Sequence, residues 1–188
     1  FFNKIDNEAK AYFLGFHVTD GNIHSKRNIF TILIAQEDTH ILEELCIRIK
    51  TKIQLLYTKN KYKNRQDIVR FERGDKQICY DLKKMGYGPK KSFYTRYPDK
   101  KFLKSKFERH FLRGIFDGDG SINKNQGRID IYSGSKIFLK DLYNVFNKYL
   151  NISSSMQIEQ RSDNRSSTRL RINAGKRKEV TKRLFDFF

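Results

Sequence analysis

A stretch of thirteen residues occurs twice in this chain, 99 positions apart. Residues 11–23 read AYFLGFHVTDGNI, and residues 110–122 read HFLRGIFDGDGSI. The offset places Gly15 on Gly114 and the pair Asp20-Gly21 on the pair Asp119-Gly120. An internal repeat at about half the chain length predicts a fold made of two similar halves.

Each copy has the pattern of a helix that is apolar on nearly every side, which is typical of a buried helix. We expect each helix to end at its Asp-Gly pair, with the glycine in the left-handed conformation that ends many helices. Ahead of the second copy, Ser105 and Glu108 have the spacing of a capping box, which predicts the start of that helix.

Two small residues lie one turn apart in each helix and share one face. Glycine inside a helix costs about 1 kcal/mol relative to alanine, so a close contact should compensate for Gly15 and Gly114. Thr19 and Gly118 follow four residues later. The pattern predicts that the two helices pack against each other about a pseudo-two-fold axis.

This packing would bring Asp20 and Asp119 together at the C-terminal ends of the helices. An anion there costs about 0.3–1 kcal/mol through the helix dipole, and the two like charges repel each other. Bound cations would relieve both penalties. The alternative is that each Asp-Gly pair is only a turn after a core helix, but the identical Gly-to-Asp spacing in both copies argues against it.

The stretches FLGFHVTDG (13–21) and LRGIFDGDG (112–120) resemble the two motifs of a LAGLIDADG homing endonuclease in its single-chain form. The first copy departs from the motif, with His17 and Val18 where the family usually has an apolar residue and Asp. The resemblance implies a site-specific DNA endonuclease that makes a double-strand break in a long target and serves intron or intein mobility. It also implies Mg²⁺ as cofactor, with Mn²⁺ as a substitute and Ca²⁺ supporting binding without cleavage.

Asp20 and Asp119 are the predicted catalytic and metal-binding residues. Hard cations such as Mg²⁺ prefer oxygen ligands and keep several waters. Divalent ions about 4 Å apart, clamped by carboxylates, activate water and stabilise the leaving group in phosphodiester hydrolysis. The backbone carbonyls of Thr19 and Gly118 would complete the metal shell.

The resemblance assigns two further catalytic positions. Gln36 matches a polar residue that orders water near the scissile phosphate in relatives, and Ser133 occupies the equivalent place in the second half. A lysine near the site follows the third helix of a half in relatives. Lys90 and Lys91 both fit this position, and we assign the role to Lys90.

Hydrophobic periodicity predicts an α+β fold in which both halves have the order αββαββα. We expect the first repeat at 1–93, a linker at 94–104 and the second repeat at 105–188. Helices should cover one face of each antiparallel sheet and leave the other face free. The two free faces would form a DNA-binding saddle.

The chain carries 39 Lys and Arg against 21 Asp and Glu, a net charge of +18 that indicates a polyanionic partner. Lysine and arginine bind phosphates, and a two-stranded ribbon fits the major groove of B-DNA. The alternative is an ordinary solvated surface, because most charge runs are exposed to water. The predicted DNA-binding residues are Lys59, Lys61, Lys63, Arg65, Arg70, Arg161, Arg169 and Arg171.

The sequence has no apolar run of about 20 residues and no signal peptide, so we expect an intracellular protein that is neither secreted nor membrane-bound. The predicted state is a monomer with internal pseudo-two-fold symmetry, bound to double-stranded DNA. Two alternatives stay open, an RNA-binding intron maturase and a catalytically inactive DNA-binding protein of the same fold. Cleavage of a cognate duplex with Mg²⁺ would separate both from the endonuclease.

Overall fold

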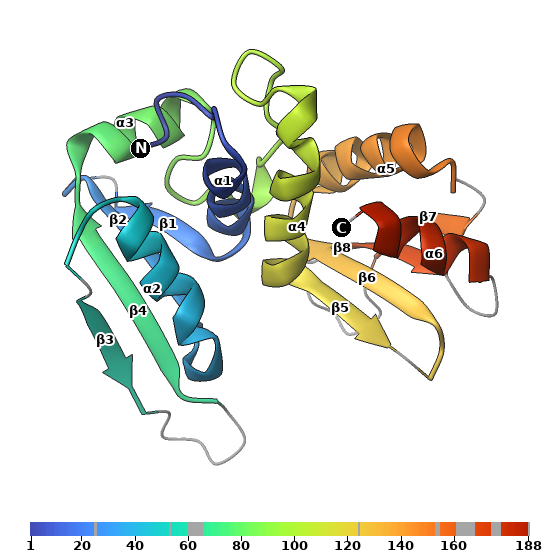
Figure 1. Cartoon of the computed structure of the whole chain (residues 1–188), viewed down its shortest axis with the longest axis horizontal. Helices are drawn as coiled ribbons and strands as arrows, with labels where there is room; N and C mark the ends of the chain where they lie inside the picture. The colour runs from blue at the N-terminus through green and yellow to red at the C-terminus, as the bar shows by residue number, and fades with distance from the viewer. Residues whose placement is uncertain are drawn as a thin grey trace.

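Two helices, one from each copy of the repeat, lie side by side at the centre of the molecule (Figure 1). The computed structural model describes residues 1–24, 26–52, 54–59, 66–123, 125–152, 155–160, 168–173 and 178–187. Each central helix leads into a four-stranded sheet of its own half.

The described elements of the two halves follow the same order, αββαββα, which confirms the predicted α+β architecture. The first half contains α1 (Glu8–Asp20), β1 (Gly21–His24), β2 (Ile29–Ala35), α2 (Thr39–Arg48), β3 (Leu55–Thr58), β4 (Ile68–Gly74) and α3 (Lys76–Lys84). The second half contains α4 (Glu108–Asp119), β5 (Gly120–Asn123), β6 (Arg128–Ser133), α5 (Lys136–Leu150), β7 (Met156–Gln160), β8 (Thr168–Asn173) and α6 (Lys178–Phe187). Short 3-10 turns η1 (Gln36–Asp38), η2 (Lys91–Phe93) and η3 (Ser105–Phe107) lie between these elements. In the part of the chain that the structure describes, none of the helices has the length and apolar character needed to cross a membrane.

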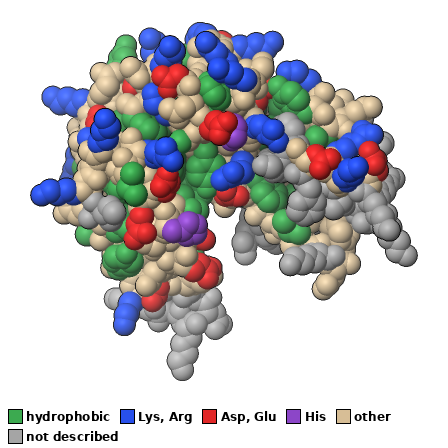
Figure 2. Space-filling view, in the orientation of Figure 1, with side chains coloured by type: hydrophobic (Ala, Val, Ile, Leu, Met, Phe, Trp, Pro, Cys, Tyr) green, Lys and Arg blue, Asp and Glu red, His purple; other side chains and the backbone are tan. Residues whose placement is uncertain are grey.

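Both sheets are antiparallel, with the strand orders β1-β2-β4-β3 and β5-β6-β8-β7. Side chains alternate between a buried face and an open face, as Ile32 and Leu33 do on β2. The sheets extend from the central helices on either side of a hollow (Figures 1 and 2). This arrangement is the saddle expected from the repeat.

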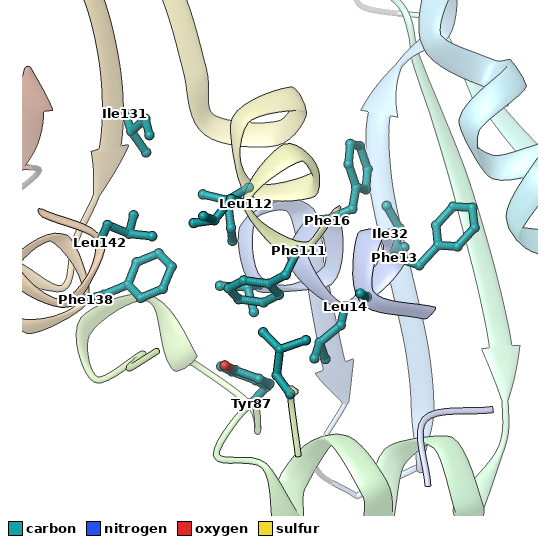
Figure 3. Packing of buried hydrophobic residues seen from close by; sticks show 14 of the residues in the cluster. Phe13, Leu14, Phe16, Ile32, Tyr87, Phe111, Leu112, Ile131, Phe138 and Leu142 are labelled. Atoms are coloured by element: carbon teal, nitrogen blue, oxygen red, sulfur yellow. The ribbon is translucent and has the colours of Figure 1, made fainter. Parts of the chain in front are cut away.

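One hydrophobic core runs through both halves by way of the central helices. On one side, Phe16 of α1 lies near Ile32 of β2, and on the other side Leu112 of α4 points toward Leu142 of α5 (Figure 3). Tyr87 is buried beneath the helix pair, and its hydroxyl donates a hydrogen bond of 3.1 Å to the carbonyl oxygen of Arg96. The two halves therefore share their apolar burial.

The contact between α1 and α4 depends on glycine in both helices. A Cβ atom added to Gly15 would lie 2.1 Å from the carbonyl oxygen of Phe111. A Cβ atom added to Gly114 would lie 2.1 Å from the carbonyl oxygen of Tyr12, which is the equivalent atom in the other copy. These matching backbone contacts confirm the predicted pairing about a pseudo-two-fold axis.

The Asp-Gly corners differ from the expectation. Gly21 and Gly120 are extended rather than left-handed, each with φ of −84°, and each begins a strand directly. Glycine is needed for space, because an added Cβ would lie 2.0 Å from the His17 ring at Gly21 and 2.6 Å from the Phe116 ring at Gly120. His17 and Phe116 are equivalent positions of the repeat, so both corners are covered by a ring from the preceding turn.

The predicted capping box before α4 was wrong. Ser105 lies in the 3-10 turn η3, and α4 begins at Glu108 with Phe107 as its N-cap and no side-chain cap. Glu108 is buried and accepts a hydrogen bond from the hydroxyl of Tyr149. A tertiary contact with α5 has therefore replaced the local cap.

We predict that Gly15→Ala and Gly114→Ala each destabilise the whole chain. The added methyl must push the helix backbones apart, and overpacking of this kind costs about 1–3 kcal/mol. In thermal unfolding each 1 kcal/mol corresponds to a loss of about 2–4 °C in Tm for a chain of this size. The matched control is Gly74→Ala, where an added Cβ meets nothing within 4 Å. Equal melting of all three variants and the parent would refute the tight pairing.

Candidate functional site

The last residues of the two central helices, Asp20 and Asp119, form the centre of the site. Gly118 allows the close approach, because an added Cβ would lie 2.0 Å from the Thr19 hydroxyl oxygen and 2.5 Å from a carboxylate oxygen of Asp20. Thr19 lies 2.8 Å from the carbonyl oxygen of Phe16 and 3.0 Å from the Asp20 carboxylate, and its hydroxyl can donate to either. Both aspartates are partly buried.

The electrostatics show that ionising this pair is costly. Burial raises the pKa of Asp119 to about 7, with a further increase from the Asp20 charge and an opposing effect of the Lys91 ammonium. Burial also raises the pKa of Asp20, against the Thr19 hydrogen bond and the Lys91 charge that lower it. Asp38 in η1 adds a third negative charge that raises the pKa of Asp20.

Lys91, rather than Lys90, is the lysine that the structure places near the aspartates. Its side chain is buried and its ammonium donates a hydrogen bond to the carbonyl oxygen of Gly21. Burial lowers the pKa of Lys91 to about 8, although the charges of Asp119 and Asp20 act to raise it. Lys90 is exposed and has a left-handed backbone with φ of 58°, so it precedes η2 on the surface.

The residues expected to order water lie in different cavities. Ser133 shares a cavity of about 250 Å³ with Asp119, and other hydroxyl groups in its lining include those of Thr19 and Ser92. Gln36 is exposed and lines a separate hollow of about 460 Å³ with Glu37, Gln66 and Asp67. Gln36 and Ser133 occupy equivalent positions in the two halves of the sequence, but the structure places them in different cavities.

The site can offer a cation the two carboxylates, and the carbonyl oxygens of Thr19 and Gly118 stay predicted ligands. Among the residues that the structure describes, no group of three or more His, Cys, Asp or Glu side chains converges on a metal position. Mg²⁺ is commonly held by only one or two carboxylates together with water and substrate phosphates. Two mutually repelling, partly buried carboxylates therefore fit such an ion, and its remaining ligands would come from water and a phosphate.

On the open face of the second sheet, Arg171 and Arg169 are already paired with acids. Arg171 binds Asp130 through two nitrogen atoms, at 2.9 and 3.3 Å, and Glu159 at 2.9 Å. Arg169 binds Glu159 at 2.6 Å and lies 3.8 Å from Asp130. Asp130, Glu159, Arg169 and Arg171, named here the β6–β8 charge network, carry no net charge. Arg171 is only 7% exposed. Its charge is therefore paired within the protein and is not presented to solvent as a free cation.

The first sheet differs from the second. Arg70 is exposed on the open face between Leu33 and Leu56, its register neighbours on β2 and β3. Its Nε lies 3.6 Å from the carboxylate of Glu72 on the same strand, in a pair that is exposed to water on both sides. Strand β3 ends at Thr58, so Lys59 lies beyond it and outside the alternation that was expected to place it on the open face. The remaining predicted contacts lie outside the described residues: Lys61, Lys63, Arg65 and Arg161.

Two features of the site were missed from the sequence. Asp38 escaped notice because only the two motif aspartates were considered as charges at the centre. The second is Asp130, which lies directly across from Arg171 in the strand register. Alternation along 128–133 would have placed this acid on the open face beside the arginines. The sequence pattern does predict Glu159 opposite them, and Glu159 lies directly across from Arg169.

Comparison with known proteins finds similarity in sequence and in fold. Residues 106–184 match the model of a LAGLIDADG-like domain. The "Probable cell division protein WhiA" of Lactobacillus delbrueckii subsp. bulgaricus is 30% identical over 132 residues, which are 65% of this chain and 42% of that protein. The chain thus spans less than half the length of this relative.

Solved structures show the same two-half LAGLIDADG fold. Full-length DUF199/WhiA from "Thermatoga maritima" has a TM-score of 0.61 at 15% identity, covering 95% of this chain and 60% of that one. The homing endonuclease I-DmoI in complex with DNA and Mn has a TM-score of 0.60 at 16% identity, covering 93% of both chains. The fold is therefore shared by homing endonucleases and WhiA.

We predict that Asp119→Asn raises the stability of the metal-free protein at pH 8 but leaves it unchanged at pH 4. The folded chain keeps the Asp119 proton up to about pH 7, whereas the carboxyl ordinarily releases it near 3.8. Stability is therefore lost as the pH rises through that window, and the amide removes the loss. After discounting for partial exposure, we expect a gain of about 1–3 kcal/mol at pH 8.

The measurement is denaturant unfolding in EDTA at several pH values. The exposed Glu43→Gln on α2 serves as the control and should follow the parent at every pH. If Asp119→Asn were less stable than the parent at pH 8, Asp119 would be a structural residue rather than an ion site.

Proposed function

We propose that this chain is a site-specific, divalent-metal-dependent DNA endonuclease that makes double-strand breaks. The observation that carries the proposal is the forced proximity of Asp20 and Asp119. Helix packing holds two like charges together in a partly buried position and raises both pKa values. A chain under selection for stability alone would gain by replacing either carboxylate.

Asp20 and Asp119 would hold the metal, which would activate water and stabilise the charge on the phosphate and the leaving oxygen. The other residues would act on the charge and the water around the ion. The buried Lys91 ammonium contributes positive charge near both aspartates. Ser133 and Gln36 would orient water in the second and first halves, from cavities of different composition.

Double-stranded DNA is the proposed substrate, seated in the saddle between the two sheets. Structures of I-DmoI and I-WcaI with DNA support this placement through the shared fold. Each aspartate would serve one strand, which gives a double-strand break as the motif resemblance implies. On the first sheet Arg70 is the described cation suited to phosphate or base contact, with leucines on both sides.

A second candidate is a DNA-binding protein of the same fold that does not cleave. The 30% identity to a probable cell division protein favours it, since that name describes no nuclease. In such a protein Asp20 and Asp119 would be present but would not catalyse cleavage. An RNA-binding maturase remains the other alternative, and the cleavage experiment separates both from the endonuclease.

The test is cleavage of a randomised duplex library with Mg²⁺, compared with EDTA, followed by plasmids that carry the selected site. We predict that Asp20→Asn and Asp119→Asn each abolish double-strand cleavage, because an amide lacks the charge that holds Mg²⁺. Binding to the selected site should stay within about threefold, since the amide keeps the carboxylate's shape. Full cleavage by either variant would remove that aspartate from the mechanism, and absence of any cleaved product with the parent would favour the non-cleaving reading.

Adjacent lysines provide a matched pair for the same assay. Lys91→Met should lower the cleavage rate strongly, while Lys90→Met should cleave like the parent because that side chain is on the surface. The reverse result would restore Lys90 to the catalytic position predicted from the sequence.

We further predict that substitution of Arg70 changes DNA affinity, whereas substitution of Arg171 changes the stability of the fold. Arg70→Ala should reduce the slope of log K against log[salt] by about 0.9 for each phosphate that Arg70 neutralises in the parent, with little change in Tm. Arg171→Ala should leave the slope nearly unchanged, because its charge is neutralised by Asp130 and Glu159. It should cost about 3–5 kcal/mol of stability, because Asp130 stays buried without its main partner. Salt titrations and thermal melts of both variants test this, and a flattened slope for Arg171→Ala would show that the network opens on DNA.

A further inference from the structure

Exposed lysines gather at the end of the molecule opposite the aspartates. Figure 2 shows Lys and Arg along the upper edge, which Figure 1 identifies as the N-terminal segment, α3 and the loop before α4. Five of these lysines come from the N-terminal segment and residues 100–106. They are named here the basic pole: Lys4, Lys100, Lys101, Lys104 and Lys106.

Three of the five lysines of the basic pole line one small cavity. Lys4, Lys101 and Lys104 line a small cavity of about 100 Å³ together with Met85 and Phe102. This cavity joins segments about 100 residues apart in sequence, so the fold rather than chain order collects the charges. A concave position between several ammonium groups suits a phosphate group.

Most of the positive charge in the basic pole is uncompensated. Asp6 pairs with Lys10 at 2.9 Å, and Asp99 lies 3.7 Å from Lys101 in an exposed pair. Among the described residues, the other four lysines of the pole have no carboxylate within 4 Å. The N-terminal ends of α1 and α4 lie at this end of the molecule and add the positive ends of two helix dipoles.

Two aromatic rings next to the lysines of the basic pole each lie close to an ammonium group. The Lys101 ammonium lies 5.0 Å from the centre of the Phe102 ring, and the Lys106 ammonium lies 4.8 Å from that of Phe107, which is buried. Proteins that bind single strands usually offer exposed aromatic rings to the bases. Lysine ammonium groups without such rings favour the phosphates of a duplex, which are contacted without reading sequence.

The basic pole is separate from the saddle. Helix α4 has 12 residues, so its two ends are about 18 Å apart at a rise of about 1.5 Å per residue. The sheets leave the helix pair at the aspartate end, whereas the pole surrounds the other end. A duplex in the saddle would therefore leave the pole exposed.

We propose that the basic pole binds the phosphate backbone of a second DNA duplex, so that one chain holds two DNA segments at once. Such contacts are independent of sequence and weaken with salt. The second segment would keep the protein on DNA while the saddle releases one site and tests another. This surface does not depend on cleavage, but the count of two duplexes rests on the duplex that the proposed function places in the saddle.

The experiment counts 24-base-pair duplexes per chain by native mass spectrometry at low salt with DNA in excess. The pole variant carries Lys→Gln at all five positions of the basic pole. The control variant has the same change in charge at exposed lysines outside the N-terminal segment, α3 and residues 100–106: Lys50, Lys52, Lys136, Lys140 and Lys182. We expect two duplexes per chain for the parent and the control, and one for the pole variant.

A single duplex on the parent, or two on the pole variant, would overturn the proposal. Competition identifies the occupant: a single-stranded RNA that displaces the second duplex better than unlabelled duplex does would also overturn it. The pole variant should melt like the parent, because its substitutions are exposed. If the chain is a nuclease, the pole variant should cut the selected site in Mg²⁺ like the parent, whereas Asp20→Asn should keep both duplexes and lose cleavage.

Discussion

The contact between the backbones of α1 and α4 is the interaction on which the rest of the structure depends. Gly15 and Gly114 each face a carbonyl oxygen of the other helix at a distance that excludes any side chain. This approach joins the two halves into one hydrophobic core. It also fixes the positions of Asp20 and Asp119, because each is the last residue of its helix. Stability of the fold and geometry of the site therefore come from the same contact.

The position of the aspartates creates an electrostatic cost that the chain only partly offsets. Burial and mutual repulsion raise the pKa of Asp119 to about 7, while the nearby Lys91 acts in the opposite direction. Lys91 is itself destabilised by burial, and its ammonium gains only the Gly21 carbonyl and the two carboxylates. The two carboxylates are thus held in a state that an added cation would improve, which is the physical basis for proposing a metal site.

Much of this arrangement could be predicted from the sequence, because a repeat specifies contacts as well as elements. The spacing of Gly15 and Asp20, found again at Gly114 and Asp119, was enough to predict the helix pair and the meeting of the carboxylates. Gly21 and Gly120 end the two helices as predicted, but the left-handed conformation expected of them was wrong. Their role depends on rings at His17 and Phe116, a packing contact that propensity does not describe. The choice between Lys90 and Lys91 depended on one backbone angle in a loop, and sequence pattern does not determine such angles.

The two halves are alike in the central helix pair and differ on the open faces of their sheets. The β6–β8 charge network is neutral and partly buried, whereas Arg70 of the first sheet is exposed between two leucines. A surface with no net charge contributes little to attraction at long range, but its fixed side chains can discriminate among partners at contact. The net positive charge of the chain does not come from this network, and five exposed lysines of the described part lie at the basic pole. A net charge of +18 therefore does not by itself locate the surface that recognises a partner.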